Sequence, residues 1–164
     1  MENLLVLLRE EAALVKAGAG TLSLAAANTH TGLVTVAAGT LALDANGALN
    51  TGITLALNGG TLAMGAATNT LGALAVLTNS AIALGAGRLS FEVAATTNLL
   101  AGAAAWTNRL SLTGELGAQT LRFGTSRAAL TAAQVSSIKL NGRAVRLKSD
   151  GYVTASWGTV IMLK

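Results

Sequence analysis

The 164-residue chain contains no cysteine and no proline. Without cysteine it forms no disulfide and no thiolate metal site, and without proline no residue removes a backbone donor from a β-ladder. Aromatic residues make up only 3% of the chain. A core built with so few large rings must be thin and regular, which favours a narrow, repetitive fold over a broad globule.

Groups suited to catalysis are also scarce. His30 is the single histidine and is interpreted as a turn residue, and no two carboxylates stand at a spacing that would place them together in a cleft. The glycine-rich runs lack the spacing of dinucleotide- and phosphate-binding loops. The sequence therefore predicts no catalytic residue, no cofactor and no metal. A carbohydrate-active β-helix enzyme is kept as a third hypothesis, which an acidic cluster on one face of the protein would revive.

Long apolar runs are missing as well. No run approaches the 18 or more residues of a membrane-spanning helix. The first eleven residues lack a basic leader, and charge interrupts their apolar run. We therefore expect a chain that is not transmembrane and that contains no export signal of its own.

A short phrase recurs through the first half of the chain. Gly20-Thr21-Leu22-Ser23-Leu24 returns as Gly39-Thr40-Leu41-Ala42-Leu43 and as Gly60-Thr61-Leu62-Ala63-Met64, at intervals of 19 and 21 residues. A blurred copy follows at Gly87-Arg88-Leu89-Ser90-Phe91. A repeat of this length with period-two alternation predicts a parallel β-solenoid, with roughly five coils between residues 14 and 117.

The alternation also predicts where the strands lie. They are expected at residues 21–24, 33–36, 40–43, 53–57, 61–64, 71–76, 81–84, 89–93 and 109–113, with alternate apolar residues facing inward. Corners are expected near Asn28, Asn46, Asn58, Asn69 and Asn79. Asn and Gly tolerate the left-handed backbone that a corner requires.

Two end segments are expected to cap the solenoid. Leucines at helical spacing predict an amphipathic helix over residues 1–13, with the pattern reaching about Lys16, and this helix would cover the strand edge of the first coil. Residues 118–164 predict a small α/β cap with a strand at 119–123, a helix at 130–135 capped by Thr131, a hairpin at 138–147 and short strands at 152–154 and 159–163. The solenoid itself is assigned to residues 14–117.

Possible contact residues lie in the basic C-terminal half and at the apolar ends. The candidate polyanion contacts are Arg122, Arg127, Lys139, Arg143, Arg146 and Lys148. They lack interleaved aromatic residues, which argues against specific nucleic-acid binding, and a solvated basic surface is the alternative interpretation. Outward Thr and Asn ladders would offer hydroxyl and amide groups to a surface glycan. The candidate self-association residues are Leu4, Leu5, Leu8, Val160, Ile161 and Leu163.

Three consecutive phrases carry a resemblance to a known family. They are Lys16-Ala17-Gly18-Ala19-Gly20-Thr21-Leu22-Ser23-Leu24, then Ala27-Asn28-Thr29-His30-Thr31-Gly32, then Val34-Thr35-Val36-Ala37-Ala38-Gly39-Thr40-Leu41. This pattern resembles the autotransporter-associated β-strand repeat, with His30 at a position where that family has tyrosine. Residues 114–152 look like the end segment that follows such repeats in large exported bacterial proteins.

The resemblance covers about residues 14–154. It implies a right-handed β-solenoid of the passenger type, exported to the cell surface or the extracellular space and used as a rigid scaffold or adhesin stalk. Its partners would be neighbouring repeats of a larger protein or further copies of the chain. A self-assembling subunit of an extracellular filament is the alternative hypothesis.

Overall fold

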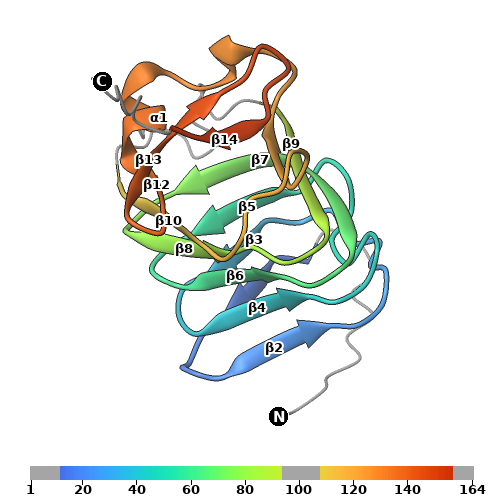
Figure 1. Ribbon diagram of the computed structural model, residues 1–164. Helices are drawn as coiled ribbons and strands as arrows, with labels where there is room; N and C mark the ends of the chain where they lie inside the picture. The colour runs from blue at the N-terminus through green and yellow to red at the C-terminus, as the bar shows by residue number, and fades with distance from the viewer. Residues whose placement is uncertain (1–11, 94–107, 157–164) are drawn as a thin grey trace, which may run out of the picture.

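The protein is a parallel β-solenoid whose strands alternate between two sheets (Figure 1). The computed structural model describes residues 12–93 and 108–156. One sheet contains β1 (Leu14–Lys16), β3 (Val34–Val36), β5 (Thr54–Leu57), β7 (Thr68–Val76), β9 (Arg88–Val93) and β11 (Leu121–Phe123). The other contains β2 (Thr21–Leu24), β4 (Thr40–Leu43), β6 (Thr61–Met64), β8 (Ser80–Ala83), β10 (Leu110–Thr113), β12 (Ile138–Leu140), β13 (Arg143–Leu147) and β14 (Val153–Ala155).

Strands β1 to β8 build four regular turns, each with one strand in either sheet, and this confirms the predicted fold class. Strands β9 to β12 continue both ladders in parallel. The sequence predicts about five coils, so the regular part is one turn shorter than expected. The right-handed sense of the coil and the domain boundaries stay predictions.

The repeated phrase forms the second sheet in register. Leu22 pairs with Leu41, and Leu41 pairs with Leu62, so the same position of each copy lies directly above the last. Leu41 and Leu62 are completely buried. Because side chains alternate across a strand, one apolar position per copy becomes one continuous stack in the core. Strands β2, β4 and β6 have the bounds that the sequence predicts.

Two sequence predictions at the edges of strands are wrong. Leu14–Lys16 is strand β1, paired with β3, whereas the helical pattern was expected to run to about Lys16. Pairing with the next coil outweighs helical spacing in this short segment. Asn69 lies within β7 and is 3% exposed, whereas a corner was expected there. Residues 1–11 of the predicted helix and the predicted strand at 159–163 lie outside the described residues.

The asparagines at the corners act through their side chains. Among the described residues other than glycine, only Asn141 has a positive φ, of 47°. The Asn28 side chain instead donates to the Ala48 carbonyl of the next coil at 2.9 Å. Asn108 likewise donates to the Val76 carbonyl at 3.0 Å. Side-chain bonds between coils, more than a left-handed backbone, therefore explain these asparagines.

The C-terminal segment, defined here as residues 124–156, contains the predicted helix and hairpin. Helix α1 (Ala132–Ser137) begins after Thr131, whose side chain accepts from the Gln134 amide in a capping box. A short 3₁₀ turn, η1 (Arg127–Ala129), precedes it. Strands β12 and β13 form the antiparallel hairpin, and β14 returns alongside β13. Tyr152 forms a bridge to Arg122 of β11, which ties this segment back to the first sheet.

The core between the sheets is mainly aliphatic. Its largest described side chains are Phe91 and Phe123, which stack with ring centroids 5.3 Å apart on paired strands β9 and β11. This confirms the thin, regular core that the scarcity of aromatic residues predicts. Within residues 12–93 and 108–156, no helix has both the length and the apolar character needed to cross a membrane.

Candidate functional site

A groove of about 580 Å³ lies between α1 and β13. Its apolar lining residues are Leu130, Val135, Val145 and Leu147, of which Leu130, Val145 and Leu147 are at most 5% exposed because they belong to the hydrophobic core. Its cationic side chains are Arg127, Lys139 and Arg146. These seven residues come from η1, the loop after it, α1, β12 and β13, so the groove exists only once the C-terminal segment has folded. We call it the α1–β13 groove.

The pairing of β12 with β13 explains why two of these cations lie on one face of the sheet. Lys139 lies opposite Ala144 in the hairpin, and Arg146 follows Ala144 by two residues. Residues two apart on a strand share a face, so Lys139 and Arg146 lie on the same face of the sheet. Helix α1 packs against β12 and β13, and the Thr131–Gln134 capping box holds its first turn.

The groove has a net positive charge. None of its lining residues is acidic. Arg146 donates from Nε to the Ser156 hydroxyl at 3.1 Å, which is an uncharged partner. In the part of the chain that the structure describes, the one salt bridge joins Lys148 and Asp150, at 3.5 Å and away from the groove. The positive potential of the three cations is therefore not cancelled by a neighbouring carboxylate of the described chain.

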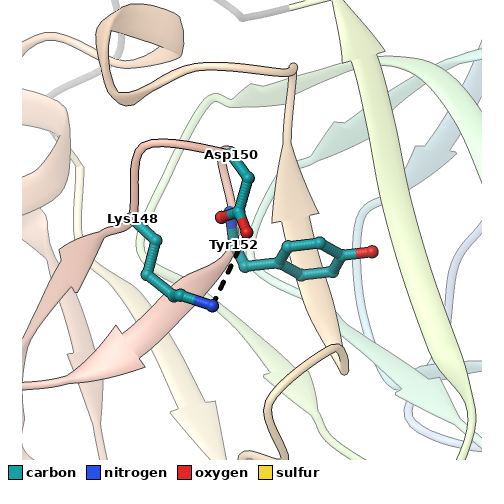
Figure 2. A network of polar contacts seen from close by, with 3 residues as sticks. All are labelled: Lys148, Asp150 and Tyr152. Carbon is teal, nitrogen blue, oxygen red and sulfur yellow. Dashed lines mark hydrogen bonds and ion pairs between the residues drawn. The ribbon is translucent and has the colours of Figure 1, made fainter.

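The other three predicted basic residues lie elsewhere. The Arg122 guanidinium carbon and the Lys148 ammonium lie 5.7 Å and 5.9 Å from the centre of the Tyr152 ring. Figure 2 shows Lys148, Asp150 and Tyr152 around the turn between β13 and β14. Arg143 lines a separate hollow, together with Leu140 and Asn141. The six candidates thus form three groups, and polyanion contact stays a prediction.

Asp150 is held ionised by this turn. Desolvation raises its pKa, but the hydrogen bond from the Tyr152 amide and the charge of Lys148 outweigh that effect, so the pKa lies below its usual value. The group is exposed. Asp150 lies outside the groove. Its bonds hold the turn between β13 and β14.

Sequence reasoning missed two buried polar side chains in the first coil. His30 is completely buried, and neither ring nitrogen has a hydrogen-bond partner. Burial lowers its pKa. Lys16 is 6% exposed and donates from Nζ to the carbonyls of Ala17, Gly18 and Ala38 at 2.9, 2.7 and 3.1 Å. The sequence held one signal for the burial of Lys16. Lys16 occupies the repeat position at which the next coil has the inward-facing Val36.

The two ends of the described ladders differ. Strands β1 and β2 are the terminal strands of their sheets, and Val15 of β1 is 60% exposed. The predicted self-association residues Leu4, Leu5, Leu8, Val160, Ile161 and Leu163 lie outside the described residues. Among residues 12–93 and 108–156, no group of three or more His, Cys, Asp or Glu side chains is placed to hold a metal ion.

Residues 14–43 match the family model of the passenger-associated transport repeat. This segment contains β1 to β4 and the first two copies of the repeated phrase. Together with the solenoid fold, the match supports a repeat of the autotransporter passenger type at residues 14–43. Comparison with curated proteins and with solved structures found no match.

Proposed function

We propose that this chain is a non-catalytic, rigid module of an exported bacterial surface protein, acting as a scaffold or adhesin stalk. The observation that supports the proposal most directly is the match at residues 14–43 to a repeat of exported passengers, on strands that stack in register. Parallel ladders that continue from coil to coil resist bending, because each coil is bonded to the next along two sheets.

Protease treatment of intact cells tests the surface location. We expect an epitope-tagged chain, expressed from its own gene, to be degraded or released when intact cells are treated with a protease. A cytoplasmic marker protein in the same cells serves as the control and should stay intact. A tagged chain that is protected to the same degree as the marker would contradict a surface stalk.

The exposed strand edge favours a second candidate function, self-assembly into a filament. A terminal strand presents unpaired backbone groups that a second copy can bind, and β1 and β2 are such strands within the described ladders. The exposed Val15 adds apolar surface at the same place. End-to-end stacking would extend both ladders at once.

A concentration series in the analytical ultracentrifuge and the electron microscope tests this second function. Val15→Lys places a charge on the edge and should abolish filaments. Thr113→Lys is the matched control, because Thr113 is exposed on β10, which is paired on both sides. A chain that stays monomeric at every concentration would exclude self-assembly. Filaments that survive Val15→Lys would exclude this edge as the contact.

A further inference from the structure

We propose that the α1–β13 groove and the outer face of the second sheet bind an acidic polysaccharide of the polyuronate class, in which each sugar carries one carboxylate. The carboxylates contact the three cations of the groove, and the ring hydroxyls contact a row of hydroxyl side chains on the sheet. The inference rests on the proposed surface function only for the source of this ligand. Binding is measured in solution and surface location on intact cells, so the two proposals fail separately.

Positive charge is concentrated in the C-terminal segment. Residues 124–156 contain five basic residues and one acidic residue, and the acidic residue lies outside the groove. Three of the five basic residues, Arg127, Lys139 and Arg146, line the groove, and no lining residue is acidic. Arginine offers paired N–H donors to a carboxylate, and lysine adds a compact charge. A single-sign cluster of this kind attracts an anionic partner.

Two of these cations stand on the outer face of the sheet. Val145 and Leu147, the neighbours of Arg146 on β13, are each 5% exposed, whereas Arg146 is exposed. Because side chains alternate across a strand, Arg146 lies on the face opposite the core, and Lys139 shares that face through its pairing with Ala144. A ligand therefore reaches both cations from solvent without displacing a core residue.

The same face carries a row of hydroxyl groups that ends at Lys139. Strands β2, β4, β6, β8, β10 and β12 follow one another along the second sheet (Figure 1), and Lys139 of β12 pairs with Ser111 of β10. Strands in a sheet lie about 4.8 Å apart, so the row extends over about 24 Å. None of its four hydroxyl residues is buried. This hydroxyl row consists of Thr21, Thr40, Thr61 and Ser111, with Ala81 between the last two.

The groove and the hydroxyl row together favour a polyuronate over other anions. Each uronate sugar offers one carboxylate and free ring hydroxyls, and a Thr or Ser hydroxyl can donate to such a group or accept from it. A densely sulfated chain has few free hydroxyls for the row. The unpaired bases of a nucleic acid stack on aromatic rings, which neither the groove nor the row contains. A lipid needs accessible apolar surface, whereas Leu130, Val145 and Leu147 of the groove belong to the buried core.

Calorimetric titration of the full chain with an oligogalacturonate that spans the groove and the hydroxyl row tests the proposal. We expect saturable binding that weakens as salt is added, because salt screens exposed charges. The fully methyl-esterified oligomer keeps its ring hydroxyls and loses its charge, so it should bind at least about tenfold more weakly. Absence of saturable binding at low ionic strength, or equal binding of the ester, would overturn the proposal without any altered protein.

Substitution of the charged residues locates the groove as the carboxylate site. Arg146→Gln and Lys139→Gln should each weaken oligogalacturonate binding by about threefold to fivefold, the upper range for an exposed charge pair. Arg143→Gln is the matched control, since Arg143 is exposed on the same strand but lines the other hollow. It should change affinity less than twofold. Equal losses for Arg143→Gln and Arg146→Gln would show attraction by general surface charge and overturn the site.

A Thr40→Val, Thr61→Val double variant tests the hydroxyl row. Valine keeps the branched shape that suits a strand and removes the hydroxyl. We expect binding of the spanning oligomer to weaken at least about fivefold. Thr70→Val is the control, because Thr70 lies on β7 in the first sheet, and it should change affinity less than twofold. Unchanged binding by the double variant would remove the row from the site and overturn the polyuronate assignment. Circular dichroism before each titration checks that every variant is folded.

Two further ligands distinguish a polyuronate from other polyanions. A heparin oligosaccharide of the same length and a DNA duplex of the same total charge are titrated under the same conditions. Each should bind more weakly than the oligogalacturonate and should not respond to the Thr40→Val, Thr61→Val double variant. Tighter binding of heparin would make a densely sulfated chain the ligand, and tighter binding of the duplex would indicate a nucleic-acid surface. Either result would overturn the polyuronate assignment.

Discussion

His30 is a buried polar residue whose side chain is unsatisfied. Both ring nitrogens lack a partner, which costs about 1–3 kcal/mol for a buried polar group. The imidazole is therefore a source of instability within the first coil, and its effect depends on pH.

Replacing His30 with phenylalanine should stabilise the protein and remove its acid sensitivity near neutral pH. Burial lowers the pKa of the folded state below the unfolded value of 6.5. Above 6.5 both states are neutral; as the pH falls below 6.5 the unfolded chain binds a proton that the folded chain does not, so stability falls. His30→Phe should raise the free energy of unfolding by about 1 kcal/mol at pH 7.5 and by more at pH 5.5. Urea unfolding at the two pH values measures this.

Assignment of the effect is direct because His30 is the only histidine in the chain. Its imidazole proton resonances follow one titration in the folded protein. A resonance that titrates at or above pH 6.5 in the folded state, or an equal loss of stability in the wild type and in His30→Phe between pH 7.5 and 5.5, would contradict the prediction.

Lys16 is also buried, but its charge is solvated by the backbone. Its three carbonyl partners include Ala38, which belongs to the next coil. Lys16→Met keeps the length and the apolar stem of the side chain while removing these bonds. Hydrogen bonds to charged groups contribute about 1.5–3 kcal/mol, so we expect a loss of about 2 kcal/mol in the free energy of unfolding. Thermal and urea unfolding measure it.

A second lysine provides the control. Lys148 is about half exposed, with its side chain 47% accessible, and pairs with the exposed Asp150. Surface pairs of this kind contribute about 0–1 kcal/mol. Lys148→Met should therefore cost clearly less than Lys16→Met. Equal costs for the two substitutions would mean that the carbonyl bonds of Lys16 add no stability beyond that of an exposed lysine.

At the scale of the element, two turn glycines allow the cost of a left-handed backbone to be distinguished from the cost of a steric clash when a side chain is added. Gly142, in the β12–β13 turn, has a φ of 81° and nothing within 4 Å of an added Cβ. Gly151, in the β13–β14 turn, has a φ of 82°, but an added Cβ would collide with the Phe123 carbonyl and lie 2.6 Å from that of Gly124. The two glycines have nearly the same φ, but only Gly142 has room for a Cβ atom.

Alanine at these two positions should therefore have unequal effects. Gly142→Ala costs only the left-handed backbone, about 1–2 kcal/mol. Gly151→Ala must in addition push β11 away, since the Phe123 amide donates to the Gly151 carbonyl at 3.0 Å. We expect a total cost above about 3 kcal/mol. Thermal unfolding of both variants measures the difference; costs within about 0.5 kcal/mol of each other would show that the turn moves freely and that β11 is not held there.

The elements that could be predicted are those whose phrase repeats. Leu22, Leu41 and Leu62 stand at one position of three copies, and that recurrence indicates both the strand and its inward face. Strand β1 lies in the other sheet, and its sequence, Leu14-Val15-Lys16, also fits a helical pattern. The segment forms a strand and not a helix because it pairs with β3, and this long-range contact leaves no local signal in the sequence.

The α1–β13 groove and the buried polar residues could not be predicted for a related reason. The hairpin and the capped helix are each visible in the sequence, but their relative placement is not, so Arg127 and Arg146 could be proposed as a cluster without a shared site. His30 was interpreted as a turn residue, and Lys16 was placed at the end of the helical pattern. Their burial depends on which neighbour covers them in the next coil.

At the scale of the whole molecule, the two ends of the solenoid are built differently. The C-terminal segment is tied back to the first sheet by the Arg122–Tyr152 bridge and by the bond from the Phe123 amide to Gly151. At the other end, β1 and β2 each have one neighbouring strand within the described ladders. In a stacked repeat, stability is the sum of each coil and its interfaces, so a coil with one interface opens more easily than a coil with two.

Native-state hydrogen exchange should therefore show a gradient along the chain. We expect the amides of β2 to exchange at least about tenfold faster than those of β6, which lies between β4 and β8. The sequence also predicts a helix over residues 1–13 that covers the first coil, and such a cover would protect β2. Comparison of the wild type with a Leu4→Ser, Leu8→Ser double variant separates the two effects. If the exposed edge dominates, the double variant exchanges like the wild type. Equal protection of β2 and β6 in the wild type, lost from β2 in the double variant, would contradict the gradient and assign the leucines to the cover of the first coil.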